Sequence, residues 1–105
     1  MRTYRLSATG AMLTDIADFT DVIGSAFADN AELVVLPVER LPPEFFRLAS
    51  GLAGEALQKF TNYRLRVAIV GDISAHVGQS RALRDFVGES NRRGEIRFIA
   101  SEADL

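Results

Sequence analysis

The chain has 105 residues, of which 48% are hydrophobic and 25% are charged, and its formal net charge is −2. These values are typical of one soluble globular domain, and we expect residues 1–105 to form it. Cysteine is absent, which excludes disulfides, thiolate metal sites and a cysteine nucleophile. The weak net charge differs from the basic stripe of nucleic-acid-binding domains, so we expect no nucleic-acid partner.

Targeting and membrane segments are not indicated. The first seven residues lack a long apolar region, so we expect no secretory signal. No apolar run approaches the roughly 18 residues of a membrane span, so we expect no membrane association and a cytoplasmic location.

The first third of the chain predicts an edge strand followed by a helix. Residues 3–8 alternate in polarity, which indicates a short hairpin or a bent edge strand before a turn at Gly10. Asp18 is a candidate N-cap for a helix over 19–29, which Asn30 ends. The expected buried face of that helix consists of Phe19, Val22, Ile23, Ala26 and Phe27.

The middle of the chain predicts a strand and then a second helix. Residues 33–36 are short and uniformly apolar, which favours a strand covered on both faces. Pro42 and Pro43 then break the chain. We expect a helix over 48–61, with Asn62 as its left-handed C-terminal cap. Its expected buried stripe consists of Leu52, Ala53, Ala56, Leu57 and Phe60.

The last third repeats this alternation. Residues 65–70 predict a second buried strand, and Ser80 could cap a helix that runs to residue 92 before Gly94 stops it. Residues 96–100 predict the last strand. Helices that alternate with short strands predict a single α/β domain, with a parallel or mixed sheet of four to five strands and helices packed on it. The final five residues would be the stub of a further helix, or a tail.

Ligands of open α/β sheets bind beyond the carboxyl ends of the strands. Polar residues of the present chain gather after the expected strands, and we take them as candidate interaction or anion-binding residues. They are Glu39, Arg40, Ser50, Gly51, Asp72, Ser74 and His76.

Ser50 and Gly51 open the central helix, whose free N–H groups favour an anion. The alternative is that Ser50 only caps the helix while Gly51 permits close packing. A negative charge is favourable at a helix N-terminus, so we expect the substitution Ser50→Asp to leave the fold intact.

His76 is the single histidine of the chain. Together with Asp72 and a serine it supplies the residue types of a hydrolytic triad. The G-x-S-x-G pattern around a nucleophile is absent, so we assign no catalytic residue and interpret His76 as a loop histidine. One histidine without cysteine leaves only carboxylates for a metal, and we expect no metal and no cofactor.

Two further features have both structural and functional interpretations. The charged span 81–94 is typical of a solvated helix face, and the alternative is a partner-binding face. We expect Phe45 and Phe46 to seal the loop over the sheet, Phe86 to be core, and Tyr63 to be partly exposed.

The run F-F-R-L-A-S-G-L-A-G-E-A-L-Q-K-F-T-N-Y-R-L-R-V-A-I-V-G-D, followed by S-R-A-L-R-D-F-V-G-E-S-N, resembles the bacterial family called domain of unknown function 4180. This resemblance covers nearly the whole chain, and the family name implies no activity. More loosely, strand, A-S-G-L-A-G-E-A-L helix and strand are similar to STAS domains, named after sulphate transporters and anti-sigma factor antagonists. That similarity implies a phosphorylatable serine at Ser50 and a kinase-like anti-sigma partner. Ala49 departs from the pattern, because an acidic residue is usual there.

The leading interpretation is a non-enzymatic regulatory or interaction module of the bacterial cytoplasm. Its working surface would be the start of the central helix at Ser50 and Gly51, and it would bind a protein partner or a second copy of the chain. The alternative is a small-molecule or anion binder, or a weak enzyme, that uses a strand-end pocket near Asp72 and His76. A flat polar surface around Ser50 favours the first, and an enclosed pocket with convergent polar groups favours the second.

Overall fold

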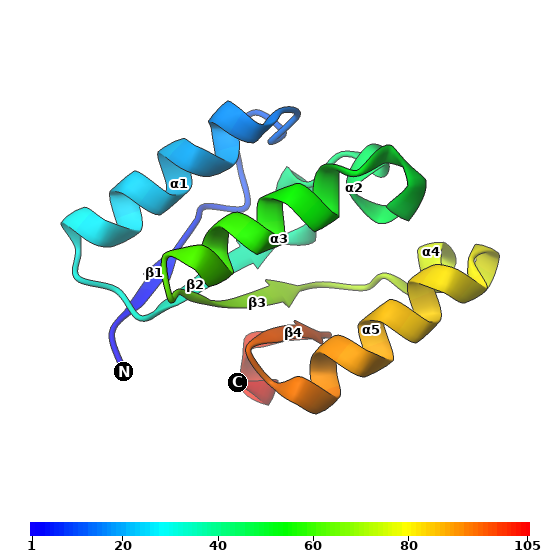
Figure 1. Cartoon of the computed structure of the whole chain (residues 1–105). Coiled ribbons are helices and arrows are strands. Elements are labelled where there is room, and N and C mark those ends of the chain that lie inside the picture. Colours follow the sequence, from blue (N-terminus) through cyan, green and yellow to red (C-terminus); the bar gives the residue numbers. More distant parts are fainter.

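Four parallel strands form one sheet in the order β1-β2-β3-β4. The computed structural model describes residues 1–105 (Figure 1). The elements are β1 (Thr3–Arg5), α1 (Ile16–Ala28), β2 (Leu33–Pro37), α2 (Pro43–Phe46), α3 (Leu52–Asn62), β3 (Arg66–Val70), α4 (Ser74–Gln79), α5 (Arg81–Arg93) and β4 (Ile96–Ile99). Short 3₁₀ turns are η1 (Val38–Arg40), η2 (Leu48–Ser50) and η3 (Glu102–Asp104). The predicted α/β class is confirmed, and the sheet is entirely parallel.

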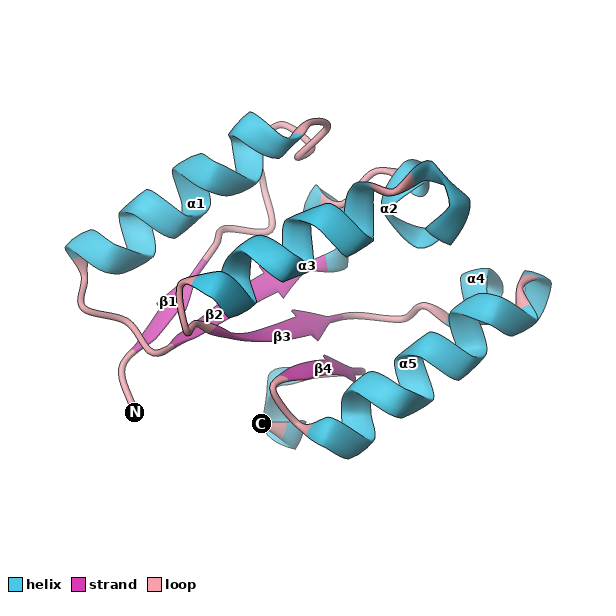
Figure 2. Ribbon diagram, viewed as in Figure 1, coloured by secondary structure: helices cyan, strands magenta, loops and turns pink.

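The long helices lie on one face of this sheet. Each connection leads to the next strand in the same direction across the sheet. Because connections between parallel strands are right-handed, the helices in these connections all lie on the same face of the sheet. Figure 2 shows α1 and α3 side by side over the sheet, and α5 alongside β4. Together they bury a core of 19 apolar residues. Strand residues such as Val34, Val67 and Phe98 face helix residues such as Phe19 and Phe60 in this core. None of the helices combines the length and the apolar character of a membrane span.

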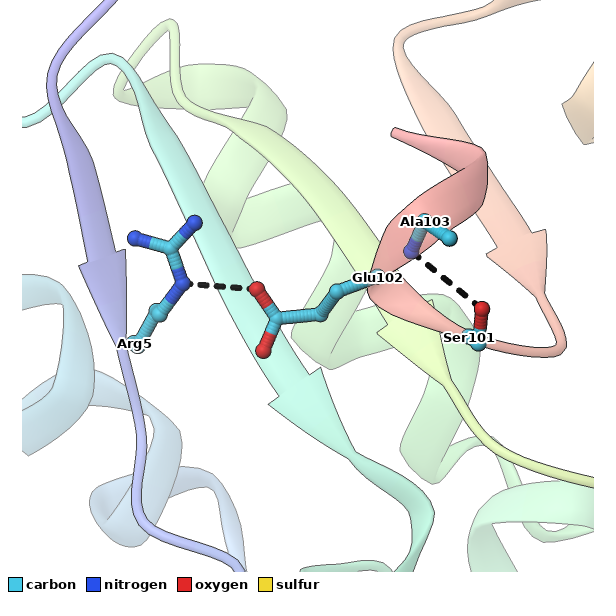
Figure 3. A network of polar contacts seen from close by, with 4 residues as sticks. All are labelled: Arg5, Ser101, Glu102 and Ala103. Atoms are coloured by element: carbon cyan, nitrogen blue, oxygen red, sulfur yellow. Dashed lines mark hydrogen bonds and ion pairs between the residues drawn. The ribbon is translucent and has the colours of Figure 1, made fainter.

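The opposite face of the sheet is covered near its centre by the C-terminal turn. Val35 and Ala68 are neighbours on this face, and they are only 3% and 1% exposed. Figure 3 shows η3 lying across the strands, with the Glu102 side chain reaching Arg5 on β1. Their N–O distance is 2.7 Å, and Arg97 donates a 2.7 Å hydrogen bond to the backbone carbonyl of Asp104. The C-terminal residues therefore form a short turn tied to β1 and β4, and β2 is buried on both faces as predicted.

Of the two alternatives for residues 3–8, the edge strand is confirmed and the hairpin is not, because β1 pairs in parallel with β2 at the edge of the sheet. The first helix differs from the prediction at its start and in its buried face. Helix α1 starts three residues earlier than expected, with Asp15 as its N-cap. Asp18 is the N3 residue of a capping box, in which its carboxylate accepts the Asp15 backbone N–H. Phe27 is 49% exposed rather than buried. The end of the helix at Asn30 is confirmed, since Asn30 has φ +54°.

The second and third helices are also adjusted at their ends. Helix α3 begins at Leu52, after the separate turn η2, instead of continuing from residue 48. Asn62 is its last helical residue, and the left-handed residue is Arg64, with φ +59°. Ser80 caps α5 by accepting the Leu83 N–H at 3.1 Å. Gly94 ends α5 with φ +86°, as predicted.

Candidate functional site

The Ser50 turn is exposed and fixed by its own hydroxyl group. The Ser50 hydroxyl donates to the Glu44 carbonyl at 2.6 Å and accepts the Leu52 N–H at 3.2 Å. The N-cap position of α3 belongs to Gly51, whose φ of +81° favours glycine. Ser50 therefore acts one residue before the cap, and the expectation that it is the N-cap is wrong. A Cβ at Gly51 would meet no atom within 4 Å, so the turn faces open space.

The segment after β3 is tied to the strand ends in a similar way. The Asp72 carboxylate accepts the Ser74 backbone N–H at 2.9 Å and so fixes the start of α4. This hydrogen bond from Ser74 lowers the pKa of Asp72. Gly71 precedes this turn, and a Cβ there would lie 2.2 Å from a methyl group of Val38 in η1. The ends of β2 and β3 can approach so closely only because residue 71 is glycine.

His76 lies on α4, so its assignment to a loop is wrong. Its ring stacks on Phe46 of α2, with ring centroids 4.3 Å apart and planes inclined by 12°. The same helix supplies the Glu44 carbonyl that holds Ser50. Helix α2 therefore links the Ser50 turn on one side with α4 on the other. Phe45 and Phe46 are both buried, as expected for side chains that seal the loop over the sheet.

Arg40 has a different role from the one predicted. Its guanidinium donates to the carbonyls of Ser7, Thr9 and Ala11 at 2.8, 3.2 and 2.6 Å. These bonds fix the loop between β1 and α1, so Arg40 supports the fold and is engaged away from Ser50. Glu39 is exposed and forms no hydrogen bond or ion pair through its side chain.

These contacts decide what the strand-end residues can do chemically. The Ser50 hydroxyl, the Asp72 carboxylate and the His76 ring each have a separate partner. No hydroxyl is hydrogen-bonded to the imidazole, so the residue types of a hydrolytic triad are not assembled. No three acidic or histidine side chains are placed to share a metal ion. The surface includes hollows of about 390 and 250 Å³, and neither of these is lined by Ser50, Asp72 or His76.

A family model described as Domain of unknown function (DUF4180) matches residues 1–105, the whole of the chain. The chain belongs to this family. No curated protein and no solved structure gives a significant match. Membership of the DUF4180 family carries no activity, so any function must be argued from the geometry. The similarity to STAS domains stays a prediction.

Two short helices of this edge were missed from the sequence, although each left a signal. Pro43 is the first residue of α2, a position at which the fixed φ of proline favours a helix. Asp72 followed by Ser74 is the pattern of a side chain that binds the backbone two residues later, which starts many turns and helices. The stack of Phe46 on His76 left no local signal, because the two residues are 30 positions apart.

Proposed function

We propose that this protein is a non-enzymatic interaction module of the bacterial cytoplasm, with its contact surface at the Ser50 turn. The observation that carries the proposal is an exposed turn held rigid from within. Ser50 and Gly51 are exposed, while the Ser50 hydroxyl is bonded to α2. A surface that is already ordered loses little conformational entropy on binding, which favours association.

The rest of this edge supports the same interpretation. Ala49, Ser50 and Gly51 form an exposed run, and the stack of His76 on Phe46 holds the neighbouring helix α2 against α4. The hollow between α3 and α5 and the hollow beside β1 and α1 are not lined by Ser50 or Gly51. An exposed and internally hydrogen-bonded turn suits a protein partner or a second copy of the chain better than an enclosed small ligand.

The turn also determines which substitution can test the proposal. The Ser50 hydroxyl donates to a carbonyl oxygen, so Ser50→Asp would set a carboxylate against that oxygen. Contrary to the expectation from the sequence, Ser50→Asp should therefore destabilise the turn, and the neighbouring Ala49 is the better position for a test. Ala49 is exposed and forms no side-chain contact of this kind, so Ala49→Arg changes the surface while leaving the turn intact. Ala28→Arg, at the exposed end of α1, is the matched control.

The test compares three tagged proteins in extracts of the native cell: the wild type, Ala49→Arg and Ala28→Arg. We expect a protein that is retained by the wild type and by Ala28→Arg but lost with Ala49→Arg. Sedimentation of the purified proteins tests self-association with the same variants. The proposal fails if Ala49→Arg melts like the wild type and loses neither a partner nor self-association.

A further inference from the structure

A groove opens onto the core between α3 and α5, and its lining includes Gly54 in the first turn of α3 and Ile96 in β4. Its volume is about 390 Å³. The floor is apolar and consists of Leu57, which is 3% exposed, and the half-buried side chains of Phe86 and Ile96. Ile96 is the first residue of β4, so one end of the groove lies at the amino end of that strand. The Ser50 turn precedes α3, and neither Ser50 nor Gly51 lines the groove.

The groove exists because the facing sides of its two helices carry small or polar residues. On α3 these are Gly54, Gln58 and Thr61, and on α5 the groove is lined by Ser90 and Arg93. A Cβ at Gly54 would meet no atom within 4 Å. Helix α1 packs against α3 through buried side chains, whereas α5 leaves this space uncovered.

The rim carries two opposite charges that are not paired with each other. The protein has two ion pairs, Arg5 with Glu102 and Arg92 with Glu89. Arg93 and Glu95 both line the groove and are exposed, and neither takes part in these pairs. A guanidinium is well suited to bind a carboxylate, and a carboxylate to bind an ammonium group, because both hydrogen bonds are then charge-assisted.

We propose that this groove binds a small zwitterion with an apolar side chain, the chemistry of a free apolar amino acid. Its carboxylate would meet Arg93, its ammonium group would meet Glu95, and its side chain would cover Phe86 and Ile96. The volume lies near the lower end of the range for small-molecule sites, about 300–1,000 Å³, which suits a ligand of this size. A plain carboxylate would leave Glu95 without a partner, and a plain amine would leave Arg93 without one.

The test is a titration of the isotope-labelled protein, followed by the shifts of its backbone amide signals. The probes are L-phenylalanine, 3-phenylpropionate and phenethylamine, which carry the same ring with both charges, the negative charge or the positive charge. We expect saturable shifts with L-phenylalanine at Leu57, Thr61 and Phe86. We expect the two singly charged probes to bind at least tenfold more weakly. Arg93→Gln and Glu95→Gln should each weaken the binding of L-phenylalanine.

Gly54→Leu fills the groove without disturbing the core, and Gly24→Leu on α1 is the matched control. Both glycines are helical and have open space where a Cβ would lie, and leucine is the better helix former. Both variants should therefore melt at or above the wild-type temperature. We expect Gly54→Leu to abolish binding and Gly24→Leu to preserve it. The proposal is overturned by an absence of saturable shifts, by equal binding of 3-phenylpropionate, or by Gly54→Leu binding like the wild type.

Discussion

The substitution Gly71→Ala should destabilise the protein through a contact that no local pattern reveals. Gly71 has φ +143°, a conformation that residues with a side chain rarely adopt. A Cβ there would lie 2.2 Å from one methyl carbon of Val38 and 3.0 Å from the other. The backbone cannot easily retreat, because the Gly71 N–H donates to the Ile99 carbonyl at 2.9 Å. Val38 is β-branched and has few alternative rotamers.

The loss of stability has two contributions, the clash with Val38 and the strained backbone conformation of residue 71. Forcing extra carbon into a packed site costs about 1–3 kcal/mol, and holding a residue with a side chain in such a conformation costs about 1–3 kcal/mol. The sum of about 2–6 kcal/mol is a large part of the stability of a small domain, about 5–15 kcal/mol. Even the lower limit corresponds to a fall in Tm of about 8–16 °C for a domain of this size.

The assay is urea denaturation of four variants against the wild type. Gly94→Ala is the control for the backbone alone, because Gly94 has φ +86° but open space where a Cβ would lie. It should cost about 1–2 kcal/mol. In a Val38→Ala background, Gly71→Ala should cost less than in the wild type, because both methyl carbons are gone. The reasoning is refuted if Gly71→Ala costs no more than Gly94→Ala, or if the Val38→Ala background leaves its cost unchanged.

Two further predictions concern the core and the first helix. Ile69 is 1% exposed, so Ile69→Ala should lower the free energy of unfolding by about 2–5 kcal/mol. Phe86 lines the groove and is half-buried, so Phe86→Ala should cost less, and the reverse order in urea denaturation would contradict this placement of the core. The Thr14 N–H lowers the pKa of Asp18 below its usual value of 3.8. The Asp18 carboxylate therefore stabilises the fold fully above about pH 4, and loses this effect as the pH falls through its folded-state pKa. The difference in urea midpoint between the wild type and Asp18→Asn should accordingly be present at neutral pH and shrink in acid, and a difference that grows in acid would contradict it.

The candidate site was only partly predictable. The positions of Ser50, Asp72 and His76 near the carboxyl ends of the strands followed from the order of strands and helices. The partner of each side chain did not. Arg40 was grouped with the site because it follows β2, yet its guanidinium binds carbonyls about 30 residues earlier. Chain proximity to a strand end does not tell where a long flexible side chain will find its acceptors.

The groove between α3 and α5 lay outside every prediction made from the sequence. Leu57 and Phe86 were both assigned to buried stripes, and each does face the core. Whether the two neighbouring helices cover the core depends on the residues with which the helices face each other, outside their buried stripes. Gly54 and Thr61 on α3 leave the space open, and this can be recognised only once the two helices have been placed beside each other.

The sequence by itself determined the strands, the three long helices and the α/β class. Apolar runs, helical periodicity and the caps at Ser80 and Gly94 act within a few residues, so they can be read locally. Two contacts were decided by the tertiary structure alone. They are the stack of Phe46 on His76 and the ion pair between Glu102 of the C-terminal turn and Arg5 of β1. These contacts join residues far apart in the chain. Their geometry is set by how helices and strands pack, which no local pattern encodes.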